Sequence, residues 1–422
     1  MDRAVLVGAP TRSVDERLAD EHMQELARLT DTAGGEVVAS LQQRIRAPHP
    51  RFFIGEGKVD ELRDLVEESE GDLVIFDDEL SPGQGKNLED HLGVRIMDRS
   101  ELILDIFASR ARTSEAKMQV ELAQLQYLLP RLKRMWSHLS RIRGGIGLRG
   151  PGETQLETDR RLIGKRISAL RRKLKDVAKA RQVQRQARRG HYRVALVGYT
   201  NAGKSSLLRT LSGSDLFVEN RLFATLDSAT RSVDLGSGHH ALVTDTVGFI
   251  RKLPHHLIAS FRSTLEEAGE ADVLVHVIDA SHTDWEEQKE VVEEVLEELG
   301  LQSAPQILAF NKVDRLTHAE EDAMRQRIRS FDSTPALFVS ALEMESLEAL
   351  KETLKARIRA TLTEVEVRVP SHDGAALAML YREGEVLRRE DNGQTVTITV
   401  RLPAASVARL RRLGVGQMVE VD

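Results

Sequence analysis

The 422-residue chain contains no cysteine, which excludes disulfide bonds and thiolate metal sites and is typical of a protein of the reducing cytoplasm. Histidines and carboxylates do not cluster at metal-ligand spacing, and we expect the pairs His239-His240 and His255-His256 to lie in surface loops. The segment from Met1 to Pro10 lacks the basic-then-apolar layout of a signal peptide. No apolar run approaches the roughly 18 residues that a membrane span needs. The sequence therefore predicts a soluble, cytoplasmic protein without a membrane span.

The formal net charge of −6 hides an uneven distribution. Between Arg131 and Gly190, 19 lysines and arginines stand against 4 acidic residues, a local balance of +15. Acidic residues concentrate elsewhere, for example from Asp284 to Glu298. This separation favours a polyanionic partner for the basic segment.

We predict a multidomain α/β protein, because single hydrophobic cores stop growing near roughly 250–300 residues. Residues 1–99 alternate short β-like runs with helical stretches, which is typical of a small parallel α/β domain. Glycine clusters at 55–58 and 83–86 each precede a helical pattern and are interpreted as strand-to-helix turns, with an anion site at a helix N-terminus as the alternative. The strand, helix, strand, strand, helix, strand pattern of residues 362–422 predicts a small ferredoxin-like α+β domain without a catalytic cluster.

Residues 100–190 predict a long antiparallel helical hairpin, which we call the arm. A helix from Ser100 to about Ser140 carries an apolar stripe from Met118 to Leu132. A second stripe with the same heptad phase runs from Leu156 to Val177. Two such stripes are expected to pack against each other.

The tip of the arm, residues 141–153, contains five glycines, three arginines and no acid before Glu153. A loop rich in both glycine and arginine suits close approach to phosphates and bases, so we predict RNA contacts by Arg141, Arg143 and Arg149. The alternative is a solvated coiled-coil face with a loose turn.

The segment Gly198–Ser205, Gly-Tyr-Thr-Asn-Ala-Gly-Lys-Ser, follows the apolar run 193–197 and precedes Leu207-Leu208. This is the strand, glycine loop and helix order of a phosphate-binding P-loop. Its glycines let consecutive backbone N–H groups turn toward a phosphate, and the following helix adds its positive dipole end. Lys204 is predicted to reach the β and γ phosphates, and the Ser205 hydroxyl to bind Mg²⁺.

Further motifs stand at the ends of later β-like runs, at residues 245–248, 279, 311–314 and 340–341. In an open α/β sheet, ligands bind at the carboxyl ends of the strands. The order and spacing of these motifs predict a P-loop GTPase domain with a doubly wound sheet over residues 191–361.

Asp314 explains the choice of base, because its carboxylate can accept hydrogen bonds from N1–H and the 2-amino group of guanine, and adenine offers no matching pair. Asn311 is predicted to tie this loop to the P-loop, and Lys312 to lie along the base plane. The Ser340-Ala341 turn is predicted to offer a backbone N–H to guanine O6.

The magnesium site is predicted from Ser205, from Asp245 through a water molecule, and from a threonine of the segment before Asp245. Thr225 is preferred to Thr230 for this role. The Gly248 N–H is expected to sense the γ-phosphate. The predicted catalytic residues are Lys204, Thr225 and Gly248. The full predicted nucleotide-binding set is Gly198, Tyr199, Thr200, Asn201, Ala202, Gly203, Lys204, Ser205, Phe223, Ala224, Thr225, Leu226, Asp227, Asp245, Thr246, Val247, Gly248, Asn311, Lys312, Val313, Asp314, Ser340, Ala341 and Leu342.

With Phe-Ala-Thr-Leu-Asp at 223–227, Asp-Thr-Val-Gly-Phe-Ile at 245–250 and Gly-Gly-Ile-Gly-Leu-Arg-Gly-Pro-Gly-Glu at 144–153, the chain resembles the HflX family of translation-factor-related GTPases. The resemblance covers the N-terminal domain, the arm and the GTPase domain. It implies a cytoplasmic GTPase that binds the large ribosomal (50S) subunit and contacts ribosomal RNA through its arm. Some members of the family split stalled ribosomes, so the resemblance also implies this activity as an expectation. We expect a monomer.

Two departures from the general GTPase pattern bear on the chemistry. Phe249 stands where many relatives place a water-orienting glutamine, so the intrinsic rate of hydrolysis is expected to be low. Leu-Glu-Met-Glu follows Ser340-Ala341 without the glycine often seen there, which weakens the predicted base contact. Asn201 occupies a position that helps to coordinate a monovalent cation in several potassium-stimulated GTPases, so K⁺ activation is a hypothesis.

Three functions remain open at this point. The first is a slow GTPase that ribosomes stimulate. The second is a nucleotide-gated ribosome- or RNA-binding module in which turnover only resets the shape. The third is an RNA-remodelling ATPase that uses the N-terminal glycine clusters as a second nucleotide site.

Overall fold

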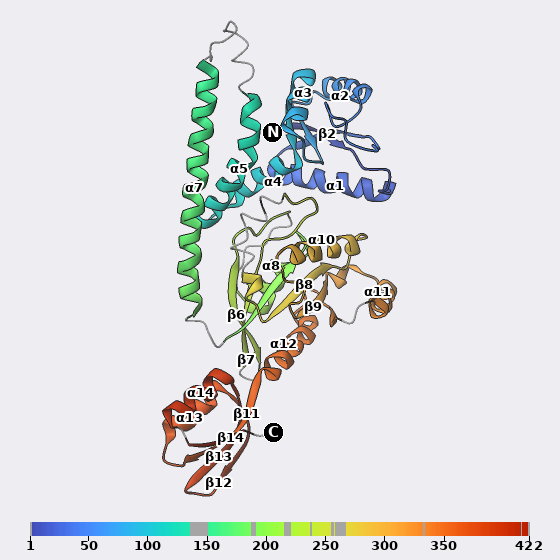
Figure 1. The fold of residues 1–422 in the computed structure, drawn as a ribbon. Coiled ribbons are helices and arrows are strands. Elements are labelled where there is room, and N and C mark those ends of the chain that lie inside the picture. Colours follow the sequence, from blue (N-terminus) through green and yellow to red (C-terminus); the bar gives the residue numbers. More distant parts are fainter. Residues whose placement is uncertain are drawn as a thin grey trace.

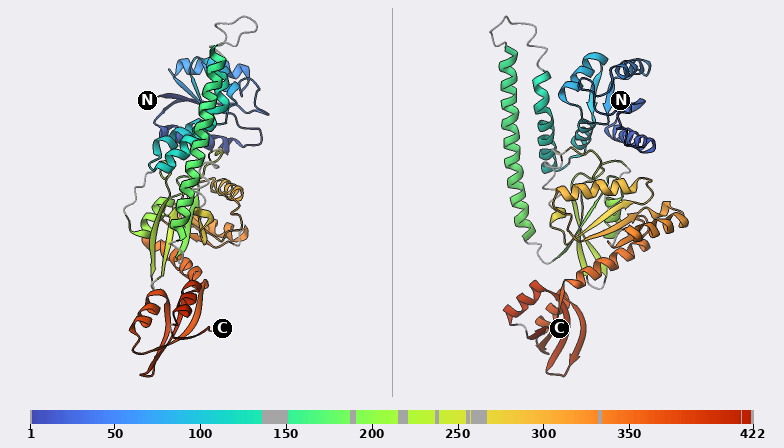
Figure 2. Two further views of the ribbon diagram at one scale, coloured as in Figure 1. Left: turned by 60° about the vertical axis from the view of Figure 1, so that its left-hand side comes forward. Right: turned by 45° about the vertical axis from the view of Figure 1, so that its right-hand side comes forward.

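Three sheets follow one another along the chain of this computed structural model, which describes residues 2–135, 151–186, 191–214, 221–236, 239–254, 257, 267–331, 334–414 and 416–420. One long helix runs beside the first two sheets, a shorter helix lies between it and the first sheet, and the third sheet lies at the opposite end of the molecule from the first (Figures 1 and 2). The multidomain α/β prediction is confirmed. The predicted boundaries after residues 99, 190 and 361 stay predictions.

The N-terminal sheet is wholly parallel and has the strand order β2-β1-β3-β4. Alternate residues of β1 face opposite cores: Ala4 and Leu6 pack with α1, whereas Val5 and Val7 pack with α2 and α3. The predicted alternation is therefore confirmed. The elements are β1 (Arg3–Gly8), α1 (Glu16–Ala33), β2 (Glu36–Gln42), α2 (Glu56–Glu68), β3 (Leu73–Phe76), α3 (Pro82–Leu92) and β4 (Arg95–Asp98).

The predicted helix from Ser100 to about Ser140 is wrong, because the chain forms two helices here. These are α4 (Arg99–Arg110) and α5 (Ser114–Met135), and they precede α7 (Pro151–Gln186). The backbone of Ala111 is extended (φ −63°, ψ 114°). The Thr113 hydroxyl then caps α5 by accepting a hydrogen bond from the Ala116 N–H at 3.1 Å. The break follows from this new cap and not from a loss of helical periodicity.

The two apolar stripes of the arm pack together as predicted. Leu122 of α5 lies against Ile167 and Leu170 of α7, and Figure 2 shows the two helices running side by side. The predicted RNA contacts Arg141, Arg143 and Arg149 lie outside the described residues.

The central sheet has six strands in the order β10-β9-β8-β5-β7-β6, and only the edge strand β6 is antiparallel to its neighbour. The sheet is therefore mixed, with helices on both faces (Figure 1). Its elements are β5 (Tyr192–Gly198), α8 (Lys204–Ser212), β6 (Ala229–Gly236), β7 (His239–Asp245), β8 (Val273–Asp279), α10 (Trp285–Glu298), β9 (Gln306–Asn311), α11 (His318–Phe331), β10 (Ala336–Phe338) and α12 (Glu348–Ala360).

The surface-loop prediction is wrong for the first histidine pair, because His239 and His240 begin β7. His239 is buried, pairs with Gly236 of β6 and lies 3.5 Å from the Glu385 carboxylate of the third sheet. His255 and His256 lie outside the described residues.

The C-terminal sheet is antiparallel, with the order β12-β13-β11-β14 and both of its helices on one side (Figure 1). This is the predicted ferredoxin-like arrangement. Among the described helices, none has the length and apolar character to cross a membrane. The elements are β11 (Leu362–Pro370), α13 (Gly374–Glu383), β12 (Glu385–Asp391), β13 (Thr395–Pro403), α14 (Ala404–Leu413) and β14 (Gln417–Glu420).

A buried charge cluster joins the N-terminal helices to the central domain. It consists of Glu25 on α1, Asp77 after β3, Arg99 on α4 and Arg251 after β7, each at most 8% exposed. Arg99 pairs with Glu25 and, at 2.8 Å, with Asp77. Arg251 reaches the same two carboxylates at 2.9 and 2.8 Å. Two cations thus balance two anions in the low-dielectric interior.

The pKa values of both carboxylates reflect this balance. Burial alone would raise the pKa of Asp77, but Arg251, Arg99 and Lys252 more than offset it and hold that pKa well below its usual range. Burial alone would also raise the pKa of Glu25, but Arg99 and Arg251 outweigh burial and lower that pKa. Because the folded-state values are depressed, the stability that these carboxylates contribute is complete above their unfolded pKa values and is lost as pH falls through the folded ones.

Replacement of one cation in the cluster is expected to be costly. Arg99→Met leaves a buried negative charge without its partner, so we expect the free energy of unfolding to fall by about 3–5 kcal/mol, measured by urea denaturation at pH 7. The loss should shrink below about pH 4, where the unfolded chain takes up protons on these carboxylates and the intact cluster of the folded unsubstituted protein does not.

Arg63→Met is the matched control, since Arg63 makes exposed ion pairs on α2 and should cost less than about 1 kcal/mol. Equal effects of the two substitutions would contradict a stabilising role for the cluster.

Candidate functional site

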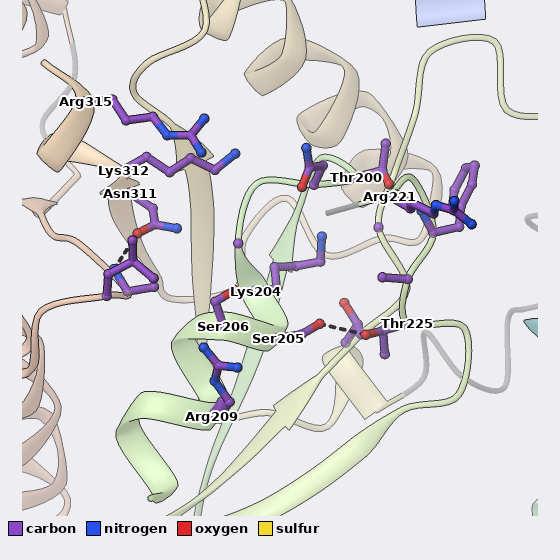
Figure 3. A pocket seen from close by; sticks show the side chains of 18 of the residues that line it. Thr200, Lys204, Ser205, Ser206, Arg209, Arg221, Thr225, Asn311, Lys312 and Arg315 are labelled. Carbon is purple, nitrogen blue, oxygen red and sulfur yellow. Dashed lines mark hydrogen bonds between the residues drawn. The ribbon is translucent and has the colours of Figure 1, made fainter. Parts of the chain in front are cut away.

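A cavity of about 340 Å³ lies at the carboxyl edge of the central sheet (Figure 3). Loops after β5, β7, β9 and β10 surround it, together with the segment that precedes β6. Its lining comprises Thr200, Asn201, Gly203, Lys204, Ser205, Ser206, Arg209, Arg221, Phe223, Ala224, Thr225, Thr246, Gly248, Asn311, Lys312, Asp314, Arg315, Ala341 and Leu342.

Most of the predicted nucleotide-binding set meets in this lining. The sequence reasoning missed Ser206, Arg209, Arg221 and Arg315. Two of them carried a signal, because Arg209 lies one helical turn beyond Ser205 and Arg315 directly follows Asp314. The predicted residues outside the lining are Gly198, Tyr199, Ala202, Leu226, Asp227, Asp245, Val247, Val313 and Ser340.

The P-loop requires glycine at two close approaches. A Cβ on Gly198 would lie 2.2 Å from the Val277 carbonyl oxygen, and one on Gly203 would lie 2.1 Å from the Asn311 side chain. Gly203 also has a positive φ of 98°. The loop therefore lies close against β8 and the β9 loop at these two positions.

Lys204 is buried at the start of α8, and its Nζ donates hydrogen bonds to the carbonyl oxygens of Gly198 and Tyr199 at 3.0 and 2.7 Å. Burial lowers the pKa of Lys204 to about 8; the Asp245 carboxylate opposes this shift and Lys312 adds to it. A phosphate in the cavity would raise this pKa again and further stabilise the charged ammonium. The site thus favours an anion on electrostatic grounds.

Three oxygen-bearing side chains converge beside Lys204. The Ser205 hydroxyl donates to Asp245 Oδ2 at 2.6 Å and lies 2.6 Å from the Thr225 hydroxyl. Asp245 Oδ1 is buried and, among the described residues, has no hydrogen-bond partner. Thr230 instead contacts Thr244, 2.9 Å away on β7. Hard oxygen donors with an unsatisfied carboxylate oxygen fit Mg²⁺, which would neutralise phosphate charge when bound.

The base-recognition loops are tied to the P-loop through Asn311. Its Nδ2 donates to the Ala202 carbonyl oxygen and its Oδ1 accepts from the Ala341 N–H, both at 2.9 Å. Asp314 accepts a 2.6 Å hydrogen bond from the Ser340 hydroxyl. Lys312 pairs with Asp279 at 2.6 Å. The Ser340-Ala341 turn is predicted to offer a backbone N–H to guanine O6; its two N–H groups already donate to Ser346 and to Asn311.

Phe249 turns away from the cavity. Its side chain is 1% exposed and packs in the apolar cluster formed with Tyr199 and Val247. Its backbone pairs with the P-loop, since its N–H donates to the Gly198 oxygen at 3.1 Å and its carbonyl accepts from the Thr200 N–H at 2.6 Å. This pairing holds Gly248 in the cavity lining, where an added Cβ would lie 3.1 Å from Lys204 Nζ.

Asp227 does not line the cavity, which corrects its place in the predicted nucleotide-binding set. Its carboxylate accepts hydrogen bonds from the N–H groups of Arg112 and Thr113 at 3.1 and 3.3 Å, and a third from the Thr113 hydroxyl. The Asp227 carboxylate therefore binds the α4–α5 junction directly before α5.

A phosphate-binding loop, an oxygen-rich metal position and a guanine-reading loop on one sheet edge define a P-loop GTPase. Family models for this class match in chain order, and the chain belongs to the HflX family of GTPases. The matches are to GTP-binding GTPase N-terminal (20–108), GTP-binding GTPase Middle Region (110–188), 50S ribosome-binding GTPase (193–312) and HflX C-terminal domain (323–422).

Curated relatives match along most of the chain. GTPase HflX of Flavobacterium psychrophilum is 45% identical over 85% of this chain and 91% of its own length. GTPase HflX of Escherichia coli is 42% identical over 92% of each chain. A solved GTP-binding protein from Sulfolobus solfataricus in complex with GDP is similar at 24% identity and a TM-score of 0.43, over 84% of this chain and 98% of that one.

Asp314→Asn is expected to lower the affinity for GDP and GTP about 10- to 100-fold, because a charged acceptor of two hydrogen bonds is replaced by a neutral amide. The amide can donate to a carbonyl, so xanthosine diphosphate, which has oxygen in place of the 2-amino group, should gain affinity. Competition with a fluorescent nucleotide measures both changes.

Asp322→Asn, an exposed change on α11, is the control for Asp314→Asn. Unchanged guanine selectivity in Asp314→Asn would sink the base-reading role.

Proposed function

We propose that this protein is a slow, Mg²⁺-dependent cytoplasmic GTPase whose GTP form binds the 50S ribosomal subunit, and whose hydrolysis ribosomes accelerate. Its action would be to split or rescue stalled 70S ribosomes. The observation that carries the proposal is the orientation of Phe249, which is buried away from the cavity. Among the described residues that line the cavity, none is a glutamine, histidine or glutamate that could orient the attacking water. This lining supports the proposal that a group from outside the chain completes the site.

Two further observations support ribosomal RNA as the partner. The match of residues 193–312 is to a family model described as a 50S ribosome-binding GTPase. The basic excess between Arg131 and Gly190 lies within the arm, and a polyanion would neutralise such a segment. We propose that the monomer contacts RNA through Arg141, Arg143 and Arg149 at the tip.

A monovalent cation is part of the proposal. Asn201 lines the cavity with a left-handed backbone (φ 61°), beside the phosphate-binding N–H groups. A K⁺ ion held there would add positive charge where charge develops during phosphoryl transfer.

The nucleotide-gated binding module stays the second candidate, because the same orientation of Phe249 leaves the intrinsic reaction without a catalytic side chain from that position. The third candidate, an RNA-remodelling ATPase that uses the N-terminal glycine clusters as a second nucleotide site, has less support. Gly57 lies inside α2, and Gly83 and Gly85 lie inside α3, so neither cluster forms a free phosphate-binding loop.

We expect 50S subunits to raise the single-turnover rate of GTP hydrolysis at least tenfold in KCl, because an external group completes the site. Reversal of the tip, Arg141→Glu with Arg143→Glu and Arg149→Glu, should remove the stimulation and flatten the salt dependence of 50S binding while GTP affinity in isolation is kept.

Reversal of Arg171, Arg172 and Lys173 is the matched control, since these residues are exposed on α7 of the same arm. Equal losses from both triple variants would mean that general charge, and not the tip, attracts the subunit. Splitting that is complete with a non-hydrolysable GTP analogue, together with no 50S stimulation, would favour the binding module.

A further inference from the structure

The segment Phe223–Asp227, which carries Thr225, is attached at both ends to the base of the arm. At one end, the Phe223 ring meets the Phe107 ring of α4 edge-on, with centroids 4.7 Å apart, and both rings are buried. At the other end, Asp227 accepts hydrogen bonds from Arg112 and Thr113 at the break between α4 and α5. Figure 1 shows α4 and the adjoining end of α5 next to the loop edge of the central sheet.

The contact at Asp227 also holds the start of α5. Thr113 is the residue before the helix, and its hydroxyl bonds both the Asp227 carboxylate and the Ala116 N–H. A carboxylate at a helix N-terminus is further stabilised by the helix dipole. The direction in which α5 leaves α4 is therefore fixed partly by a residue of the central domain, 114 positions later than Thr113.

Thr225 lies between these two anchors and faces the P-loop, 2.6 Å from the Ser205 hydroxyl. Four residues of extended chain span at most about 14 Å, so Thr225 stays within a short length of chain of both anchors. A third contact limits the segment further, because the Phe223 N–H donates to the Thr200 hydroxyl at 2.8 Å. The position of Thr225 and the position of the arm base cannot change independently.

We propose that Asp227 is a positioning residue that couples the nucleotide site to the arm: while Asp227 holds the α4–α5 junction, Thr225 stays beside Ser205, and release of one end displaces the other. The inference rests on the proposed function in one respect, since the ligand of the arm is taken to be ribosomal RNA. Its part within the isolated protein does not depend on ribosomes.

Thermodynamic linkage requires that this coupling act both from the arm to the nucleotide site and from the nucleotide site to the arm. A ligand that binds the arm in the orientation seen here stabilises Thr225 beside Ser205, and a nucleotide that holds Thr225 stabilises that arm orientation by the same factor. Bound GTP with Mg²⁺ would thus prepare the arm for RNA, and RNA would prepare the site for hydrolysis. Couplings of this kind amount to roughly 5- to 150-fold.

The first test uses the isolated protein. We expect Asp227→Asn to lower the single-turnover rate of GTP hydrolysis roughly tenfold with little change in GDP affinity, because Thr225 is displaced while the P-loop is intact. Thr113→Val should lower the rate by a similar factor, whereas Thr113→Ser, which keeps the hydroxyl, should hydrolyse GTP at the rate of the unsubstituted protein. The double variant Asp227→Asn with Thr113→Val should be no slower than either single variant.

Amide hydrogen exchange at residues 112–116 reports directly on the α4–α5 junction, which a rate of hydrolysis does not. In the unsubstituted protein, a GTP analogue should slow this exchange relative to GDP, and Asp227→Asn should abolish the difference. Asp234→Asn, an exposed change on β6, is the control and should leave both readouts unchanged. Retention of nucleotide-dependent protection in Asp227→Asn would overturn the inference.

The second test separates the inference from the proposed function. The 50S stimulation factor should fall about tenfold in Asp227→Asn although the subunit still binds. Equal stimulation of Asp227→Asn and the unsubstituted protein would overturn the coupling and leave the proposed function standing. No stimulation of the unsubstituted protein would remove the ribosomal partner, whereas the exchange result would still decide the coupling within the chain.

Discussion

The loop edge of the GTPase sheet is covered by helices of the same chain, and this packing constrains each loop that surrounds the phosphate position. Tyr199 of the P-loop donates a hydrogen bond to Glu25 on α1 and accepts one from the Arg251 N–H. The segment after β7 enters the buried charge cluster through Arg251, and the segment before β6 reaches the arm through Asp227. A shift in any one of these loops therefore strains a contact with the N-terminal half.

Buried charges fix the positions of these loops more narrowly than apolar contacts would. Apolar surfaces tolerate sliding, whereas a guanidinium that pairs with two carboxylates has few satisfactory positions. Departure of Arg251 would leave Glu25, Asp77 and Arg99 buried with an excess negative charge, a costly state. The cluster thus selects one placement of the loop that carries Gly248. We regard geometric selection, more than net stability, as its physical consequence.

The sequence predicted those parts of the site that are contiguous in the chain. The P-loop, Asn311 with its neighbours, and Asp245 are each defined by a short motif after an apolar strand, and sheet topology brings such motifs together. Contacts between distant segments were not predictable. The α4–α5 junction contacts Asp227, 115 positions later than Arg112, and His239 lies against Glu385 in the third sheet. Helical periodicity and residue type carry no information about partners more than a hundred positions away.

Phe249 connects these observations to the reaction. Its side chain belongs to a core shared with α1 and α4, so it is committed to packing and is unavailable to the attacking water, while its backbone aligns Gly248 with the P-loop. The residue that many GTPases use for catalysis is here used for attachment to the N-terminal half. The same packing places the segment that carries Thr225 against the base of the arm, through Phe223 and Asp227. Under the proposed function, a dependence of hydrolysis on the partner of the arm would follow from this packing.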